Sequence, residues 1–292
     1  MSKIGVLIWR KLFETNDEKR IAKQKQDISD LVITKDIPYI DDDEQGHLLD
    51  IYRLPTTSEN APVMINIHGG GLFASYKEVN AHFNYEWARM GYRVVSISYR
   101  RIPETTLWHQ IDDVMAALRF IRANADAFCL NLDRCCLTGD SAGALLSMFA
   151  LALVNSEKLQ RDFQIKGTDI RFRAAGLISI MLDTQRADIM RTLSNMITDK
   201  SDKGKAYEKY LLDPVSLIKE TNLPPLYLVT SKEDLIRKDT LKLKGHLTTE
   251  YRFKDFPKIK GRRLFHVFSV AYPMYLESRE VFNEMDSFFK AH

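Results

Sequence analysis

Continuous apolar runs that alternate with helix-like stretches constrain the fold of this chain more than any other feature. The apolar runs cover residues 63–67, 94–99, 135–138, 174–182 and 226–230, and the helix-like stretches cover 80–90, 110–125, 142–156 and 235–247. Strands that are apolar throughout are buried on both faces, and strands that alternate with helices form parallel sheets. The pattern therefore predicts an α/β fold with a mostly parallel central sheet and helices on both faces.

Shorter patterns extend this core at both ends. Residues 37–40 and 48–54 have period-two spacing around an acidic turn, which predicts an antiparallel hairpin. Residues 251–256 would add one more strand. Residues 274–291 would close the chain with an amphipathic helix.

Two segments lie outside the alternation. Residues 1–35 are mostly helix-like and form either a flexible arm or a helical lid, ahead of an α/β domain at 36–292. Residues 183–212 have helical periodicity where a strand is due. Such an insertion would lie above the carboxyl edge of the sheet, where ligands bind in open α/β folds. An ordinary crossover helix with long loops is the alternative.

Composition limits the environment and the partners. The 292 residues are 45% hydrophobic, and 42 basic residues against 39 acidic ones give a net charge of only +3, which argues against nucleic-acid binding. The three cysteines, Cys129, Cys135 and Cys136, are clustered without metal-like spacing and suit a reducing compartment. The apolar run 4–9 is too short for a secretory signal, and run 142–154 is too short to span a bilayer. We expect a cytoplasmic protein with no membrane span and no bound metal.

A Gly139-Asp140-Ser141-Ala142-Gly143 stretch joins an apolar run to the helix-like run that follows it. Around a serine on such a sharp strand-to-helix turn, the residues two positions either way nearly touch, and glycine avoids the collision. The turn lifts the hydroxyl clear of the sheet and directs the first amides of the next helix towards a bound oxygen. We interpret Ser141 as a nucleophile, with a plain strand-to-helix turn as the alternative.

A second glycine-rich stretch, His68-Gly69-Gly70-Gly71, directly follows the apolar run 63–67. Successive glycines leave their backbone amides unshielded, so that such a loop can turn N–H groups towards a bound oxygen. Two such amides and that of Ala142 would form an oxyanion hole from main chain alone; a flexible turn is the alternative. Just beyond this loop, Phe73 and Tyr76 either line the acyl or alcohol pocket or belong to the core.

A serine hydroxyl needs a base, and three histidines follow the serine in the chain order of such hydrolases. His292 is the terminal residue, and His246 ends a charged helix. His266 lies in an apolar loop between the last predicted strand and the last predicted helix. We predict that His266 is the base, with a buried structural histidine as the alternative.

The base must in turn be oriented by an acid. Asp234 stands just past the apolar run 226–230, where a carboxylate would project from the carboxyl edge of the sheet. Glu233 is a neighbouring candidate, and Asp239 lies one turn further into the predicted helix. A helix N-cap or a solvated charge is also ordinary for aspartate. We predict that Asp234 is the acid.

Other short stretches accompany the two glycine motifs. They are Leu49-Asp50-Ile51-Tyr52, Tyr99-Arg100 followed by Pro103-Glu104, and Asp112-Asp113-Val114. Together with the motifs they resemble the hormone-sensitive-lipase-like carboxylesterases of the α/β-hydrolase superfamily, over residues 47–290. Two positions depart from that family, which usually has glycine after the catalytic histidine and proline after the acid: Val267 and Leu235 stand there.

The resemblance implies an α/β-hydrolase fold and hydrolysis of carboxylic esters without a cofactor. It also implies oxyanion amides at Gly69, Gly70 and Ala142, and a helical cap built from segments 1–35 and 183–212. We therefore expect a serine carboxylesterase with a Ser141-His266-Asp234 triad, acting on small-molecule, short-chain esters, with a homodimer as a possible assembly. The alternatives are a carbohydrate acetyl esterase, an aryl formamidase, or a non-catalytic ligand-binding protein on the same scaffold.

Overall fold

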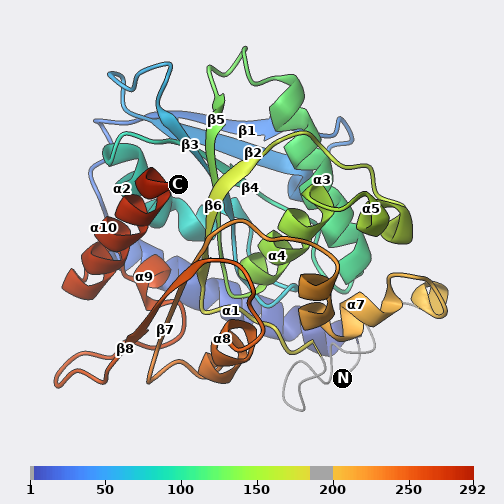
Figure 1. Cartoon of the computed structure of the whole chain (residues 1–292). Helices are drawn as coiled ribbons and strands as arrows, with labels where there is room; N and C mark the ends of the chain where they lie inside the picture. The colour runs from blue at the N-terminus through green and yellow to red at the C-terminus, as the bar shows by residue number, and fades with distance from the viewer. Residues whose placement is uncertain (1–2, 185–199) are drawn as a thin grey trace.

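The fold is built on one eight-stranded sheet in the order β1-β2-β4-β3-β5-β6-β7-β8 (Figure 1). The computed structural model describes residues 3–184 and 200–292. Strands β3 to β8 are parallel, whereas β2 pairs antiparallel with both β1 and β4. The strands are β1 (Val32–Pro38), β2 (Leu48–Arg53), β3 (Pro62–Ile67), β4 (Arg93–Ile97), β5 (Asn131–Asp140), β6 (Phe172–Ile178), β7 (Leu226–Ser231) and β8 (Tyr251–Phe256).

Helices cover both faces of this sheet, as the apolar runs predicted. In Figure 1, α2, α9 and α10 lie on one side and α3, α4 and α5 on the other. The helices are α1 (Lys3–Lys23), α2 (Ala81–Arg89), α3 (Leu107–Ala123), α4 (Ala142–Val154), α5 (Glu157–Phe163), α7 (Glu208–Leu212), α8 (Arg237–Lys244), α9 (Phe268–Ala271) and α10 (Leu276–Ala291). This is the α/β-hydrolase fold.

Each face of the sheet has its own hydrophobic core. Cys135 belongs to the cluster under α3 and α4, while its neighbour Cys136 belongs to the cluster under α2, α9 and α10. Successive side chains of a strand point to opposite faces, so adjacent small apolar residues serve both cores. Both thiols are free and buried, and they serve as small apolar fillers of the two cores.

The predicted N-terminal hairpin is confirmed as the antiparallel pair β1 and β2. Asp36 interrupts the register of β1 with φ +56°, and its amide donates to Oδ1 of Asp50 (2.8 Å). The buried ammonium of Lys77 lies 2.7 Å from Asp36, 3.2 Å from Asp50 and 2.5 Å from Glu78. Such a cation stabilises the hairpin because it neutralises carboxylates that would otherwise be buried or crowded without a partner.

The two segments outside the alternation are only partly described. Among its described residues, segment 1–35 contains helix α1 and the first four residues of β1, so the expected boundary at residue 35 falls inside a strand. Segment 183–212 contains a short turn at Lys200–Asp202 and helix α7, while 185–199 lie outside the described residues. Within residues 3–184 and 200–292, no single helix is long and apolar enough to cross a membrane. Helices α4 and α5 together pass that test of length and composition, but they are bent by 115°.

Candidate active site

Ser141 occupies the sharp turn between β5 and α4. Its backbone has φ +51° and ψ −117°, and its amide donates to the carbonyl of Ile178 (2.9 Å). The flanking glycines are required by space: a Cβ on Gly139 would lie 2.5 Å from the carbonyl oxygen of Gly143, and a Cβ on Gly143 would collide with the carbonyl oxygen of Ile67. The turn is therefore the strained strand-to-helix corner that the motif predicted.

His266 lies beside this serine, on the loop between β8 and α9. Its Nε2 is 2.9 Å from Oγ of Ser141, and its Nδ1 is 2.9 Å from Oδ1 of Asp234, which follows β7. Three residues from three separate loops at the carboxyl edge of the sheet thus form one hydrogen-bonded line. If the proton between His266 and Asp234 is on Nδ1, Nε2 is free to accept from the serine hydroxyl.

The surroundings of Asp234 keep its carboxylate charged and fixed. The side chain accepts hydrogen bonds from the amide of Ile236 and from Oγ1 of Thr230, both at 2.9 Å. Burial on its own raises the pKa of this carboxyl, but the hydrogen bond and charge of His266 outweigh burial and hold the pKa below its ordinary value. An ionised, immobile carboxylate can orient an imidazole and stabilise its positive charge.

The rival candidates for base and acid lie away from this line. His246 is bonded to the carbonyl of Lys242 in its own helix, and His292 lies 3.3 Å from Glu250. Glu233 accepts from the amide of Leu264 (2.9 Å) and so fixes the loop that carries His266. Asp239 accepts from the amides of residues 182 and 183 (2.9 and 3.0 Å). Both acids hold backbone in place and do not touch the imidazole.

One predicted oxyanion donor differs from expectation. The amide of Gly69 donates to Oδ1 of Asp140 (3.0 Å), which also accepts from Nδ2 of Asn80 (2.7 Å), so this N–H is already engaged. The next two glycines, Gly70 (φ +117°) and Gly71 (φ +62°), line the pocket in front of Ser141. Spacing in the sequence locates such a loop, but it does not reveal which way each amide points. The amide of Gly69 is therefore not free to donate to a substrate oxygen in this structure.

Ala142 remains a suitable donor because it is the first residue of α4. The first amides of a helix have no acceptor within it, and the helix dipole makes this end positive. Its N–H group stands next to the serine hydroxyl in the chain. An oxygen that gains negative charge in front of Ser141 would be stabilised by this helix end.

His68 shapes the glycine loop from behind. Its Nδ1 lies 2.6 Å from the carbonyl oxygen of Gly69, and its ring stacks on Tyr99 with centroids 4.4 Å apart. Burial lowers the pKa of this imidazole to about 4, so it is neutral at ordinary pH. Its Nε2 has no partner among the described residues. We interpret His68 as a rigid support for the loop.

A cavity of about 550 Å³ opens in front of Ser141 and His266. Helix α1 forms one wall with Phe13, Asn16, Asp17 and Arg20, and Phe73 packs edge-on against Phe13 with centroids 5.9 Å apart. Phe73 therefore lies where the sequence analysis expected a pocket residue.

Tyr76 does not line this cavity, which corrects the other expected pocket residue. Its ring is covered by the guanidinium of Arg101, 3.9 Å from the ring centroid, and it faces a neighbouring surface hollow. Ser75, with φ +68°, turns the chain between Phe73 and Tyr76, so the side chains of these two residues point in different directions. The cation–π contact then holds Tyr76 outside the cavity.

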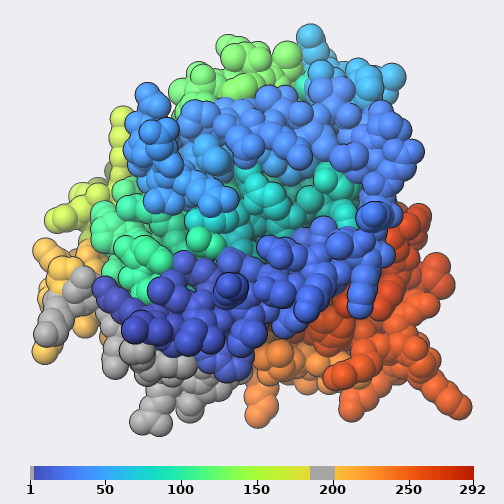
Figure 2. Space-filling model, turned by 180° about the vertical axis from the view of Figure 1, so that it is seen from behind, coloured from blue at the N-terminus to red at the C-terminus, as the bar shows by residue number. Residues whose placement is uncertain are grey.

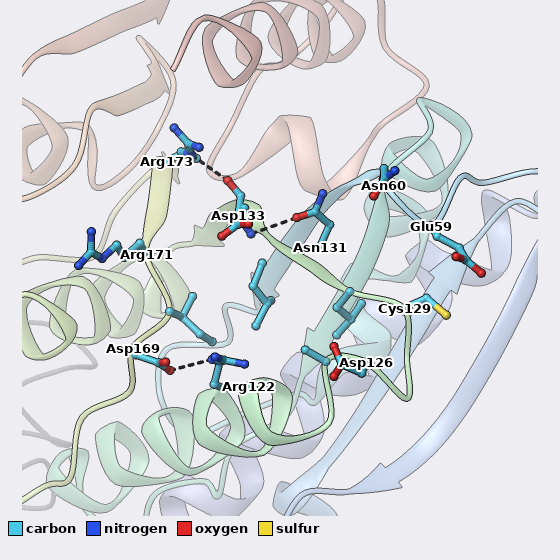
Figure 3. A pocket seen from close by; sticks show the side chains of 14 residues that line it. Glu59, Asn60, Arg122, Asp126, Cys129, Asn131, Asp133, Asp169, Arg171 and Arg173 are labelled. Atoms are coloured by element: carbon cyan, nitrogen blue, oxygen red, sulfur yellow. Dashed lines mark hydrogen bonds and ion pairs between the residues drawn. The ribbon is translucent and has the colours of Figure 1, made fainter.

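A larger cavity, of about 1050 Å³, lies at the opposite edge of the sheet (Figure 3). Its walls include Asn131 at the start of β5, whereas Ser141 follows the end of this ten-residue strand. Charged side chains from the starts of strands, from loops and from the end of α3 surround it, and Figure 3 shows Arg122 of α3 paired with Asp169 of a loop. Neither Ser141 nor His266 reaches this cavity, so its greater volume does not make it the candidate active site.

A metal is a separate question from these cavities. In the part of the chain that the structure describes, no group of three or more His, Cys, Asp or Glu side chains is arranged to hold a metal ion. The polar group that contacts the hydroxyl of Ser141 is the imidazole of His266, which in turn contacts the carboxylate of Asp234.

Comparison with known proteins now gives the family. The model of the BD-FAE family matches residues 49–239, about two thirds of the chain, and this stretch contains both glycine motifs and Asp234. The chain belongs to the BD-FAE family. With its fold and its motifs it is a hormone-sensitive-lipase-like α/β-hydrolase, as the resemblance implied.

The similar proteins of this BD-FAE chain are named as ester hydrolases. A probable carboxylic ester hydrolase, LipM, of Mycobacterium tuberculosis is 28% identical, and the match covers 68% of this chain and 47% of LipM. Carboxylesterase NlhH of the same organism is 27% identical, and the match covers 65% of this chain and 61% of NlhH. The chain spans about half the length of the first curated relatives it matches.

Solved structures extend the likeness of this BD-FAE chain over its whole length. Esterase B of Lactobacillus rhamnosis has a TM-score of 0.89 and 26% identity over 99% of this chain and 94% of its own. The same esterase inhibited by a tributyrin phosphonate has a TM-score of 0.90 and 25% identity over 100% of this chain and 96% of its own. This likeness includes the N-terminal helix, which lies outside the BD-FAE match.

Sequence reasoning left open whether α1 is a lid or a flexible arm in this BD-FAE protein, and it did not identify the residues of α1 that line the pocket. Phe13, Asn16, Asp17 and Arg20 recur at helical spacing and so share one face of α1, but their types do not distinguish a pocket wall from a solvated face. The signal is in the partners: Glu14 on the same helix accepts from the amide of Ser75 (2.9 Å). That contact joins residues 61 positions apart, which no local pattern reveals.

Proposed function

We propose that the protein is a serine carboxylesterase that hydrolyses short-chain carboxylic esters through an acyl-enzyme, with Ser141, His266 and Asp234 as its triad. One observation carries the proposal: the two nitrogens of His266 lie 2.9 Å from the serine hydroxyl and 2.9 Å from the carboxylate. A nucleophile, a base and a group that orients the base are the minimum for covalent acyl transfer.

The reaction follows from these contacts. Nε2 of His266 takes the proton as Oγ of Ser141 attacks the ester carbonyl, and Asp234 stabilises the imidazolium that forms. The amides of Gly70, Gly71 and Ala142 bind the developing oxyanion, and the amino end of α4 adds its dipole. His266 then returns the proton to the leaving alcohol. Water attacks the acyl-enzyme by the same route in reverse and frees Ser141.

The cavity supports an ester with a small apolar acyl or alcohol group. Its volume of about 550 Å³ is within the range of pockets for small molecules, and Phe13, Phe73, Met181 and Val270 contribute apolar walls. The hydroxyls of a sugar ester would meet no hydrogen-bond partner at these four side chains, so this part of the cavity favours an apolar group over a carbohydrate. We further propose that α1 is part of a cap over the site.

Hydrolysis of p-nitrophenyl acetate, butyrate and dodecanoate by the purified chain tests this function. We expect acetate and butyrate to be cleaved faster than dodecanoate, and Ser141→Ala to lose turnover. His266→Ala should also lose it, whereas the control His246→Ala, at an exposed position, should retain the wild-type rate. Turnover that survives in Ser141→Ala would overturn the proposal, and a preference for dodecanoate would overturn its short-chain part.

A further inference from the structure

The first half of α1 exposes an unusual concentration of apolar side chains. Twelve large apolar residues are exposed in the part of the chain described, and six of them fall between positions 4 and 13. Ile4, Ile8 and Leu12 are 68%, 58% and 55% exposed, and Leu7 and Trp9 are 43% and 40% exposed. Figure 2 shows α1, in dark blue, lying across the outside of the molecule. We call Ile4, Leu7, Ile8, Trp9 and Leu12 the outer face of α1.

The way α1 is attached explains why this face points outward. Val6 and Arg10, four positions apart, are its buried residues, and residues four apart share one side of a helix. Arg10 donates to the carbonyls of Phe73 and Ile102 (both 2.6 Å) and pairs with Glu104. These contacts fix the rotation of the helix. The outer face consequently cannot turn inward without breaking them.

The charges around the outer face are of one sign. Residues 3–13 contain Lys3, Arg10 and Lys11 and no acidic residue; the first acid is Glu14. Arg10 is paired with Glu104, but neither Lys3 nor Lys11, both exposed, has an ion pair among the described residues. Apolar side chains that include a tryptophan, flanked by unpaired lysines, are the composition of helices that lie in the surface of an anionic membrane.

The outer face of α1 also borders the cavity of the candidate active site. Phe13 follows Leu12 directly and lines this cavity while remaining 44% exposed. Leu235, which is 74% exposed, lines the same cavity from the loop after β7. An ester held in a surface that contacts α1 would therefore meet the apolar side chains of Phe13 and Leu235 as it enters the cavity.

We propose that the outer face of α1 docks on an anionic phospholipid surface, so that the enzyme takes ester substrates dissolved in that surface. The uptake of esters from the surface rests on the proposed function, whereas the docking does not. A second copy of this chain is a poorer occupant. In a two-fold contact the same patch lies on both sides, so Lys3 and Lys11, which have no ion pair among the described residues, would face the same two lysines of the other copy.

Flotation of the full-length chain with vesicles tests the docking without any activity. We expect binding to vesicles of phosphatidylglycerol and phosphatidylcholine, and much weaker binding to phosphatidylcholine alone. A variant with Ile4→Ser, Leu7→Ser and Ile8→Ser should bind these vesicles at least about tenfold more weakly, because the apolar side chains no longer enter the lipid. Lys3→Glu with Lys11→Glu should lose the preference for phosphatidylglycerol. The control is Tyr251→Ser, an exposed apolar position on the edge strand β8, which should bind as the wild type does.

Activity provides the second readout. The triple serine variant should cleave dissolved p-nitrophenyl acetate at the wild-type rate, but should lose about tenfold in rate on tributyrin incorporated in the phosphatidylglycerol vesicles. Equal vesicle binding by the wild type and the triple variant would overturn the docking, as would no binding of the wild type. A dimer of the wild type that the triple variant abolishes would assign the face to a second copy instead. Vesicle binding as expected without any ester hydrolysis would reject the proposed function and leave the docking intact.

Discussion

Two residues beside the reacting groups have backbone conformations that side chains disfavour. Ser141 has φ +51°, and Val267, directly after His266, has φ +52°. Each costs of the order of 1–3 kcal/mol and persists only where tertiary contacts hold it. The amide of Ser141 is held by Ile178, and that of Val267 by Oγ of Ser179 (3.4 Å). This conformation also gives a physical reason for the glycine that related sequences have after the histidine.

At this scale, the pair of adjacent acids, Asp234 and Glu233, gives a matched test. Asp234→Asn should lower kcat by about 10⁴-fold, because an amide at this position favours the wrong tautomer of His266. Glu233→Gln should change kcat far less, since among the described residues the carboxylate of Glu233 accepts from the amide of Leu264 and approaches Arg263, without contact to His266. Steady-state kinetics on p-nitrophenyl butyrate measures both.

The control for folding is the unfolding temperature of the two variants, which should both remain close to that of the wild type. A larger loss of kcat in Glu233→Gln than in Asp234→Asn would show that Asp234 is not the acid of the triad.

Sequence spacing predicted the identity of these groups better than their directions. Ser141, His266 and Asp234 meet because chain order and strand ends constrain them. Gly69 was assigned an oxyanion role, yet its amide points to Asp140, since the direction of an N–H depends on backbone angles that a run of glycines leaves free. Tyr76 was expected near the substrate, and its contact with Arg101 is a tertiary contact that no local pattern indicates.

At the scale of elements, α1 is attached to the body through a few charged side chains. Besides Arg10, Glu14 pairs with Arg101 (2.6 Å), and Arg20 donates to the carbonyl of Ala271 (2.9 Å). Charge-assisted hydrogen bonds to buried carbonyls are stronger than neutral ones. A helix held at Arg10, Glu14 and Arg20 can form a fixed wall of the cavity even though its outer face is exposed.

Arg10→Leu should therefore loosen this wall. Loss of the guanidinium leaves the carbonyls of Phe73 and Ile102 without their donor, and we expect about 2 kcal/mol less stability. We also expect a KM for p-nitrophenyl butyrate several-fold higher, with kcat less affected, because Phe13 no longer bounds the cavity. Denaturant unfolding and steady-state kinetics measure the two effects.

Lys11→Leu is the matched control, since the adjacent lysine is exposed on the same helix and should leave both quantities unchanged. An unchanged KM in Arg10→Leu would show that α1 is not part of the substrate pocket.

The long elements were predictable and the short ones were not. The period-two and apolar runs overlap strands β2 to β8, and the long helices α2, α3, α4, α8 and α10 fell where expected; the first strand was expected at 37–40, but β1 covers Val32–Pro38 and shares only residues 37 and 38 with it. Helices α5 and α9, of seven and four residues, were missed, while α7 falls within residues 183–212, where helical periodicity was expected without defined bounds. Helices this short show barely two turns of periodicity and depend on tertiary packing. The position of α1 on the rest of the protein depends on contacts with residues far along the chain, and for this reason the sequence left its role open.

Two buried histidines contribute to the stability of the protein with opposite dependence on pH. His47 lies between Asp42 (2.8 Å) and Asp113 (3.1 Å); burial lowers the pKa of its imidazole, but these carboxylates outweigh burial and raise the pKa above its ordinary 6.5. His68 has no such partner, and burial lowers the pKa of its imidazole to about 4. The stability supplied by His47 is present below pH 6.5 and is lost as pH rises through its folded pKa. The stability supplied by neutral His68 is present above pH 6.5 and is lost as pH falls towards 4.

The difference in unfolding free energy between the wild type and a variant should therefore depend on pH with opposite sign at the two positions. For His47→Gln the difference should shrink from about pH 6 to about pH 9, and for His68→Gln it should shrink from about pH 7.5 to about pH 4.5. Urea unfolding at these pH values measures both. The same direction of change in both variants would contradict the assigned environments.

The central claim for the molecule is that Ser141 becomes acylated. Acid quenching of the wild type during turnover of p-nitrophenyl butyrate, followed by mass spectrometry of the digested chain, tests it directly. We expect one butyryl group on the peptide that contains Ser141, accumulating further in Asp234→Asn if that change slows deacylation more than acylation, and no such group in Ser141→Ala. A butyryl group on a different residue, or its persistence in Ser141→Ala, would contradict the account.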